Sequence, residues 1–391
     1  MNFSDVKSLS NQYLMSTYNK FDISIEKGKD CTLYDINGKE YIDLTSGIGV
    51  NCLGHSNPII VDAVKNQAQK LLHMSNLYYN ENQAVLAEKL VKASNMKRVF
   101  FCNSGAEANE GAIKIARKYS TDKYKKDRTD IISLKMSFHG RTITTLSATG
   151  QDAMHEYFHP FTQGFVYSKA NDIDDIKSKI TDKTCAVMIE LIQGEGGVVV
   201  LEKDFVKELY ELCSQKDILL IADEVQTGIA RTAKMFCFEH YDIIPDIVTL
   251  AKGLGGGFPI GAVLCSQKTE NTLTASTHGT TFGGNPMACA VASAVVDEVC
   301  KKEFLEEVEK KGQYLKEKLS KVKNVINVRG KGLMIGFDVN NMKAIDVLNK
   351  CIENNLLILT AKNSLRLLPP LVISYSDIDK AVCILDKVIN N

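Results

Sequence analysis

The middle of the chain alternates short, continuously apolar segments with segments of helical periodicity, and this alternation constrains the fold more than any other feature. The apolar segments are 98–102, 131–135, 185–189, 218–222, 247–251 and 260–265. Helical patterns at 107–119 and 204–215 fall between them. Strands that are apolar throughout, rather than at every second residue, are buried on both faces of a sheet. We therefore expect an α/β fold with a mostly parallel sheet that helices cover on both sides.

The pattern changes after about residue 286. Long Lys- and Glu-rich helical patterns at 287–302 and 304–321 precede short strands near 332–338 and 365–368, which predicts a smaller α+β domain. The first 50 or so residues do not continue the parallel sheet, and we expect them to pack against the C-terminal part. The predicted organisation is an N-terminal segment (1–55), a large domain (56–286) and a small C-terminal domain (287–391).

Charge and composition exclude several classes of partner. The 391 residues carry 47 Lys+Arg and 47 Asp+Glu, so the net charge is zero and favours neither nucleic acid nor an anionic membrane as a partner. No apolar run approaches the roughly 18 residues of a membrane helix, and the polar N-terminus does not look like a signal peptide. We expect a cytoplasmic protein. The eleven cysteines are scattered without a C-x-x-C pair, which favours buried free thiols.

Ligands of open α/β sheets bind beyond the carboxyl ends of the strands, so the residues after each strand are the candidates for a site. The segment 103–107 follows the first strand, and its Ser104 and Glu107 have the spacing of a capping box. Gly105 and Ala106 would then present open backbone N–H groups at a helix N-terminus, which suits a phosphate. An ordinary capped helix would give the same pattern.

Three further strand ends carry chemistry. Phe138 and Arg141 follow the strand at 131–135, where an aromatic ring could stack on a planar ligand and an Arg could hold a carboxylate. Asp223 follows 218–222 as in the second acidic motif of P-loop ATPases, but the chain lacks the G-x-x-x-x-G-K-[ST] loop that this interpretation requires. Lys252 follows 247–251, where a buried Lys is costly unless it is paired or modified.

An Asp, a Lys, an aromatic residue and a phosphate seat together are the parts of a pyridoxal 5'-phosphate (PLP) site. A competing pattern is H-E-x-x-H at 155–159, which is typical of zinc proteases. That chemistry needs both His on one helix face and a further ligand, and Pro160 disfavours a helix at His159. We therefore expect no metal site here, and the zinc hydrolase remains only as an alternative.

At this point the motifs resemble those of class III PLP-dependent aminotransferases. The stretches 223–232 and 251–262 resemble the family's D-E-V-Q-T-G-x-x-R-T motif and its PLP-lysine segment. The stretches 46–55, 76–79 and 277–285 resemble the acetylornithine aminotransferase branch in particular. The resemblance runs from about Tyr18 to Pro370. It implies PLP fold type I, with a mostly parallel seven-stranded sheet, a smaller α+β domain and a homodimer with shared active sites.

The resemblance also implies roles for individual residues. Lys252 would bind the cofactor covalently and move a proton, and Asp223 would pair with the pyridine nitrogen. The other cofactor-binding positions are Gly105 and Ala106 (phosphate), Phe138 and Val225 (ring faces), Gln226 (ring hydroxyl) and Thr281 (phosphate of the partner subunit's site). The substrate-binding positions are Tyr18, Thr280, Arg141 (carboxylate of the amine donor), Arg366 (α-carboxylate of 2-oxoglutarate or glutamate) and Glu195 (a mask for Arg366).

The implied reaction is transfer of the terminal amino group of N2-acetylornithine to 2-oxoglutarate in arginine biosynthesis. Because the pocket for the acyl group is not legible in the sequence, ornithine, succinylornithine, 4-aminobutyrate and succinyl-diaminopimelate remain alternative donors. Another PLP chemistry on the same fold, such as an aminomutase, also remains open.

Arginine is scarce, since only seven of the 47 basic residues are Arg. Its planar fork suits carboxylate recognition, so Arg141 and Arg366 are candidate clamps for small diacids. Arg231 lies inside a family motif and is expected to be structural. For most of the others, a solvated or helix-surface role is expected: Arg98, Arg117, Arg128 and Arg329.

Overall fold

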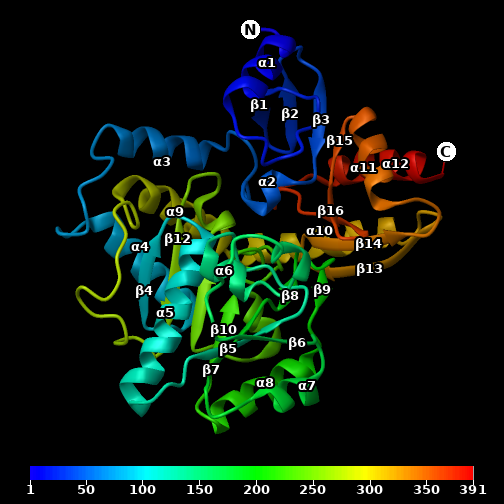
Figure 1. Cartoon of the computed structure of the whole chain (residues 1–391). Helices are drawn as coiled ribbons and strands as arrows, with labels where there is room; N and C mark the ends of the chain where they lie inside the picture. The colour runs from blue at the N-terminus through cyan, green and yellow to red at the C-terminus, as the bar shows by residue number, and fades with distance from the viewer. Residues whose placement is uncertain (391) are drawn as a thin grey trace.

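The computed structural model describes residues 1–390, and its centre is a seven-stranded sheet (Figure 1). The strand order is β4 (Arg98–Cys102), β12 (Gly261–Cys265), β11 (Ile247–Leu250), β10 (Leu219–Asp223), β7 (Thr184–Ile189), β5 (Asp130–Leu134) and β6 (Phe165–Ser168). All neighbours from β11 to β6 pair in parallel, whereas β12 runs antiparallel to both β4 and β11. The predicted mostly parallel seven-stranded sheet is confirmed.

Helices cover both faces of this sheet because its strands are apolar on both sides. The small side chains of α5 (Gly105–Tyr124) pack on one face, over alternate strand residues such as Ile131, Leu219 and Val263. The intervening strand residues face the opposite side and join a second core. That side carries α4 (Glu81–Ser94), α7 (Ile173–Lys179), α8 (Lys203–Gln215) and α9 (Pro286–Val299). The sheet is thus buried from edge to edge, and its polar strand ends are left for a site.

The C-terminal part forms an antiparallel sheet with its own helices. Its strands are ordered β13 (Val325–Lys331), β14 (Met334–Val339), β17 (Ser364–Leu367) and β16 (Leu359–Ala361). The accompanying helices are α10 (Lys302–Leu319), α11 (Ala344–Glu353) and α12 (Tyr375–Asn390). This arrangement is the smaller α+β unit that the sequence predicts.

The N-terminal segment shares a sheet with the C-terminal part. This sheet is ordered β1 (Ile25–Lys29), β2 (Thr32–Asp35), β3 (Glu40–Asp43) and β15 (Leu356–Leu357), and β15 pairs in parallel with β3. In Figure 1 the blue N-terminal strands accordingly stand beside the orange C-terminal elements. The remaining elements before the large sheet are α1 (Phe3–Tyr13), α2 (Ser46–Gly49) and α3 (Pro58–Ala68).

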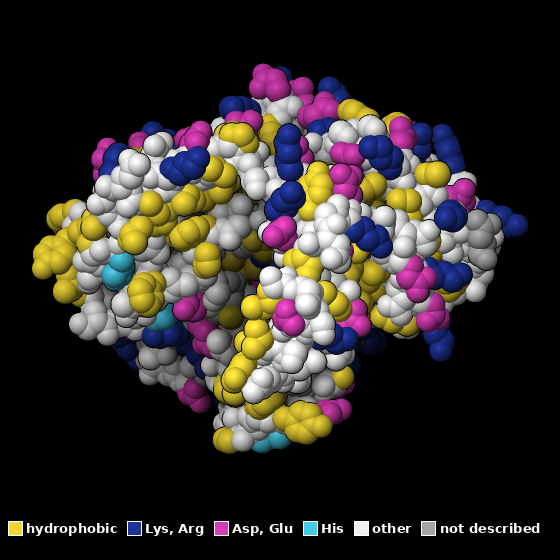
Figure 2. All heavy atoms as spheres, turned by 90° about the horizontal axis from the view of Figure 1, so that it is seen from above, with side chains coloured by type: hydrophobic (Ala, Val, Ile, Leu, Met, Phe, Trp, Pro, Cys, Tyr) yellow, Lys and Arg dark blue, Asp and Glu magenta, His cyan; other side chains and the backbone are white. Residues whose placement is uncertain are grey.

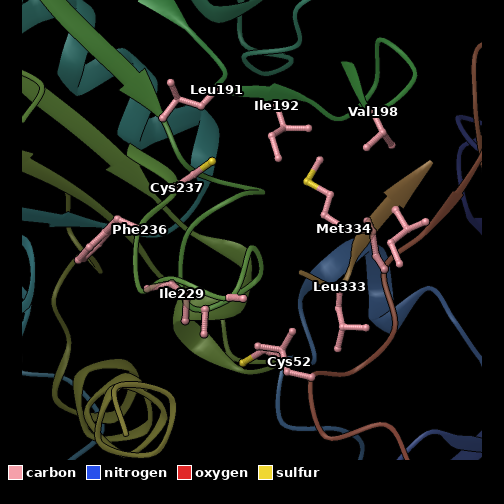
Figure 3. Close-up of a cluster of buried hydrophobic side chains, with 14 of the residues drawn as sticks. Cys52, Leu191, Ile192, Val198, Ile229, Phe236, Cys237, Leu333 and Met334 are labelled. Carbon is pink, nitrogen blue, oxygen red and sulfur yellow. The ribbon is translucent and has the colours of Figure 1, made fainter. Parts of the chain in front are cut away.

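One continuous core joins the large unit to the smaller one. Figure 3 shows Ile192, Val198 and Ile229 of the large unit in the same buried cluster as Leu333 and Met334 of the C-terminal part. Helix α9 lies beyond the predicted boundary at residue 286, yet it packs against α3 and α4. The precise domain boundaries therefore stay a prediction.

Shorter elements complete the chain. They are α6 (Ile143–Ala148), β8 (Ile192–Gln193), β9 (Val199–Val200) and three 3-10 turns, η1 (Asp152–Met154), η2 (Cys237–Tyr241) and η3 (Lys252–Gly255). Nine of the eleven cysteines are buried and all are free. No helix among residues 1–390 has the length and apolar character of a membrane span.

Candidate active site

A cavity of about 430 Å³ opens at the carboxyl edge of the large sheet. This is the size of a small-molecule site. Its walls come from the segments that follow β4, β5, β10 and β11, together with Val50 of the N-terminal segment and the stretch 257–260. The cavity brings together eight residues that the sequence predicts for the site: Gly105, Ala106, Phe138, Arg141, Asp223, Val225, Gln226 and Lys252.

Asp223 ends β10 and is held by three hydrogen bonds. Its Oδ2 accepts from Asn109 Nδ2 at 2.7 Å and lies 2.8 Å from His139 Nδ1, and its Oδ1 accepts from the backbone N–H of Val225 at 3.0 Å. Only 4% of Asp223 is exposed. Donors on both oxygens fix the direction of the carboxylate. Asp223 is therefore a rigid anion that suits a protonated ring nitrogen.

Sequence reasoning missed the two residues that hold Asp223. Asn109 lies on the inner face of α5, and its Nδ2 also donates to the carbonyl of His139 at 2.7 Å. His139 is buried, and its Nε2 has no hydrogen-bond partner among residues 1–390. The signal was available for His139, which follows the strand end beside Phe138. Asn109 gave none, because only the fold brings α5 to β10.

The N-terminus of α5 opens into the cavity. The helix begins at Gly105, two residues before its predicted start, and the Ser104 side chain accepts from the backbone N–H of Glu107 at 3.1 Å. The reciprocal bond of the expected capping box goes instead from the Asn103 backbone N–H to Glu107 Oε2. The first N–H groups of a helix have no acceptor within it, so those of Gly105 and Ala106 are available to an anion.

Gly105 is a glycine for a steric reason. A Cβ at this position would lie 2.7 Å from Cγ1 of Val225, so a side chain here would displace the valine that lines the cavity. The absence of this side chain brings the helix N-terminus close to the segment that carries Asp223. The predicted phosphate-binding residues and Asp223 therefore lie on one wall of the cavity.

Lys252 lies at the end of β11, next to the end of β10, as the sequence predicts. Burial lowers the pKa of its ammonium group, against the opposing effect of the Glu195 carboxylate. A lowered pKa raises the fraction of free amine, which is the nucleophilic form. Its backbone has a φ of 42°, in the left-handed region that is costly for a lysine. Such strain is common at functional positions.

Arg366 projects from β17, and 2% of it is exposed. Its Nη1 donates to Oε1 of Glu195 at 2.7 Å and to Oε1 of Gln226 at 3.1 Å. Its Nε has no partner among residues 1–390. The predicted carboxylate clamp is therefore occupied by a carboxylate of the protein itself, and Gln226 points toward Arg366.

Glu190, which the sequence did not identify, lines the same cavity. Its Oε2 accepts from the backbone N–H of Phe138 at 2.9 Å, and its Oε1 accepts from that of Gly194 at 3.3 Å. Burial raises the pKa of this carboxyl to about 7. Glu190 thus joins the segment of Phe138 to the loop of Glu195.

Five predicted substrate or cofactor residues do not line this cavity: Tyr18, Thr280, Thr281 and the pair Glu195 and Arg366. Tyr18 is 79% exposed and lines a separate cavity beside α1. Thr280 accepts from Asn103 Nδ2 at 3.0 Å, next to the α5 N-terminus, and Thr281 is exposed. Arg141 stays at the rim, exposed, with its guanidinium 5.6 Å from the centre of the Phe138 ring.

The zinc-protease pattern lacks the geometry that a metal would need. The residues from His155 to His159 are not helical, and Nε2 of His155 is 2.8 Å from the carbonyl oxygen of Leu146. Among residues 1–390, no three His, Cys, Asp or Glu side chains gather as a metal centre would require. His155 contacts a backbone carbonyl and His159 packs against the ring of Phe161.

The expected solvated or helix-surface role is wrong for Arg128, which is buried, and for Arg329, which lies on a strand, whereas Arg117 lies partly exposed on helix α5. Arg117, Arg128 and Arg329 each donate to backbone carbonyls of distant segments. Arg98 is solvated, with a long contact to Glu270 at 3.7 Å. Arg231 is fully buried and donates to the carbonyls of Leu333 and Pro369, which confirms a structural role.

A lysine that follows one strand and an aspartate at the end of the neighbouring parallel strand, in one cavity with an open helix N-terminus, are typical of the PLP enzymes of fold type I. Within this class, the profile of the family described as Aminotransferase class-III matches residues 13–389. The chain belongs to this family, whose members depend on PLP.

Individual relatives agree with this assignment. The chain is 49% identical to the acetylornithine aminotransferase of Haemophilus ducreyi over the full length of both chains. It is 48% identical to that of Caldanaerobacter subterraneus, covering 97% of this chain and 98% of the relative. The structure of N-acetylornithine aminotransferase from Stenotrophomonas maltophilia matches with a TM-score of 0.85 at 37% identity, covering 98% of each chain. Ornithine aminotransferase from Toxoplasma gondii matches with a TM-score of 0.94 at 32% identity, covering 100% of this chain and 95% of that one.

Proposed function

We propose that this enzyme transfers the terminal amino group of N2-acetylornithine to 2-oxoglutarate, and so forms N-acetylglutamate 5-semialdehyde and glutamate in arginine biosynthesis. The placement of Lys252 beside Asp223 in one cavity carries the proposal for the chemistry. The similarity to acetylornithine aminotransferases along the whole chain supports the choice of donor.

When bound, PLP supplies an electron-accepting ring for the carbon that loses its proton. Lys252, with its lowered pKa, takes that proton and returns it to the neighbouring carbon as a general base and then a general acid. Asp223, whose position is fixed by Asn109 and His139, would stabilise a positive charge on the ring nitrogen through its own negative charge. Phe138 and Val225 both line the cavity, where they would confine a flat ring between them.

Two arginines give the two substrates different positions. A donor that reacts through its terminal amine must have its carboxylate held far from the reacting atoms, and Arg141 at the cavity rim suits that task. Arg366 suits the α-carboxylate of 2-oxoglutarate. Glu195 covers Arg366 at 2.7 Å and must leave before the diacid binds. The pair thereby keeps Arg366 neutralised while the donor reacts.

A homodimer in the cytoplasm is part of the proposal. Thr281 is exposed and outside the cavity of its own chain, as expected for a residue that serves the partner subunit's site. Figure 2 shows apolar side chains on the face seen from above, beside a hollow in the surface. Tyr18 and several further large apolar residues are exposed: Leu72, Leu77, Tyr78, Tyr79 and Phe282. A second subunit would cover such residues.

Lys252→Ala tests the proposed chemistry. Loss of the proposed base and covalent anchor should abolish turnover and the visible absorbance of the lysine-bound cofactor. The assay couples glutamate release to a dehydrogenase, with N2-acetylornithine as the donor. Turnover that survives in this variant without added amines would refute the assignment.

Donor choice needs a second experiment with the unmodified enzyme. The same assay is run with ornithine, succinylornithine, 4-aminobutyrate and succinyl-diaminopimelate, and we expect the highest kcat/KM for N2-acetylornithine. A higher value for another donor would assign that donor instead. Turnover without 2-oxoglutarate would indicate an aminomutase.

A further inference from the structure

The loop that carries Glu195 is joined to the C-terminal sheet by Arg329, in addition to the Glu195–Arg366 pair itself. This loop is the tip of the hairpin between β8 and β9, and the carbonyl of its Gly197 accepts two hydrogen bonds from Arg329. The bonds come from Nε at 2.9 Å and Nη2 at 2.6 Å. Arg329 lies on β13 of the C-terminal sheet. The contact therefore crosses from the large unit to the smaller one.

The same guanidinium also holds the strand that carries Arg366. Arg329 Nη2 donates to Oγ of Ser364 at 2.7 Å, and Ser364 is the first residue of β17. Asp338 on β14 orients the guanidinium with both carboxylate oxygens, at 3.1 and 3.2 Å. Gly197 lies two positions after Glu195, and Ser364 lies two positions before Arg366. One side chain thus connects both partners of the Glu195–Arg366 pair.

Packing at the next residues supports this connection. Gly336 is the register partner of Arg366 on β14, and a Cβ on Gly336 would lie 2.7 Å from Cβ of Val198. Figure 3 shows Val198 facing Met334, which begins β14. The loop thus packs directly on the strands beside Arg366, and no space is left for a side chain at Gly336.

We infer that Arg329 is a positioning residue that sets the Glu195 loop against the strand of Arg366 and thereby controls how well Glu195 masks Arg366. Backbone pairing with β14 and β16 holds Arg366 independently, whereas Glu195 stands at a loop tip with its side chain 29% exposed. Loss of Arg329 should therefore displace Glu195 rather than Arg366. A lysine could not replace it, because three segments need the fork of donors.

The inference rests on the proposed function, and the two half-reactions test it separately. In single-turnover experiments, Arg329→Met should lower kcat/KM for N2-acetylornithine by about tenfold, as expected for misplacement by a fraction of an ångström. The half-reaction with 2-oxoglutarate should be unchanged or faster, because Arg366 is less often covered. Equal losses in both half-reactions would overturn the inference.

A matched control separates positioning from stability. Arg128 likewise joins distant segments through backbone carbonyls, those of Thr184, Lys216 and Asp217, but it contacts neither the Glu195 loop nor the strand of Arg366. Arg128→Met should lower the thermal midpoint and leave the ratio of the two half-reactions unchanged. A ratio that moves equally in both variants would count against a specific role for Arg329.

Two further measurements identify Glu195 as the target. In an Glu195→Gln background, Arg329→Met should change the ratio of half-reactions little further, and fully additive effects would contradict the inference. Glutarate, which cannot react, should bind Arg329→Met at least as tightly as the unmodified enzyme in calorimetry, and weaker binding would contradict it. If Arg329→Met does not fold, Ser364→Ala removes one bond of the same connection and should shift the ratio in the same direction. An unmodified enzyme that lacks either half-reaction would refute the proposed function instead.

Discussion

Asp223→Asn separates the role of a charge from the role of a shape. Oδ2 of Asp223 accepts two hydrogen bonds and Oδ1 accepts one, so an amide at this position must place its NH₂ group against a donor. The least costly orientation keeps the amide oxygen toward Asn109 and His139. The NH₂ group then faces the Val225 backbone N–H at a position where 3.0 Å separates the atoms now.

The contacts of Asp223 allow both the loss of stability and the loss of turnover in Asp223→Asn to be estimated. Loss of one buried hydrogen bond, with two donors left facing each other, should cost about 1–3 kcal/mol of unfolding free energy. We expect turnover to be affected more strongly than stability, because a neutral amide cannot stabilise a positive charge on the ring nitrogen. Removal of a fixed charge from a water-excluded site should slow turnover by at least about 100-fold, or about 2.7 kcal/mol of barrier.

The coupled glutamate assay measures turnover, and urea unfolding monitored by circular dichroism measures stability. Asp246→Asn is a matched control, since Asp246 precedes β11 at the opposite edge of the same sheet and accepts the backbone N–H of Leu220 at 2.9 Å. This control should lose stability without a comparable loss of turnover. A folded Asp223→Asn enzyme with turnover within tenfold of the unmodified enzyme would show that the charge of Asp223 is dispensable.

Two more predictions concern the cavity walls. Gly105→Ala places a Cβ 2.7 Å from Val225, so PLP affinity, measured by absorbance titration of the apoenzyme, should fall by about tenfold or more, and an unchanged affinity would contradict this steric role. Burial raises the pKa of Glu190 from 4.5 to about 7. The protonated carboxyl therefore contributes fully to stability below pH 4.5, and this contribution is lost as the pH rises through 7. Glu190→Gln should therefore reduce the fall of the unfolding midpoint with pH over this window. An unaltered slope of midpoint against pH would refute the conclusion that Glu190 causes this fall.

The parts of the site that follow strand ends were predictable, because strand ends are legible in sequence. Six of the seven strands of the large sheet lie within one residue of their predicted bounds. The seventh, β6, was not recognised from its residues, since a four-residue edge strand with two polar positions has too little apolar character. It was expected only through the family resemblance. Lys252 and Asp223 were placed together because β10 and β11 are neighbours and parallel.

What sequence could not supply are contacts between elements that are distant in the chain. Asn109 reaches Asp223 across 114 positions, and Arg329 reaches Gly197 across 132. The seven arginines show why. Scarcity correctly suggested that the planar fork is needed, but a fork serves carbonyls as well as it serves carboxylates. An arginine that binds a substrate and an arginine that joins two segments of the chain cannot be told apart from sequence. Only the acceptors distinguish them: Arg366 faces a carboxylate beside an open cavity, whereas Arg128 and Arg231 are surrounded by main chain. Arg329 donates to main-chain carbonyls, as Arg128 and Arg231 do. The segments that it joins, however, carry Glu195 and Arg366 of the candidate site.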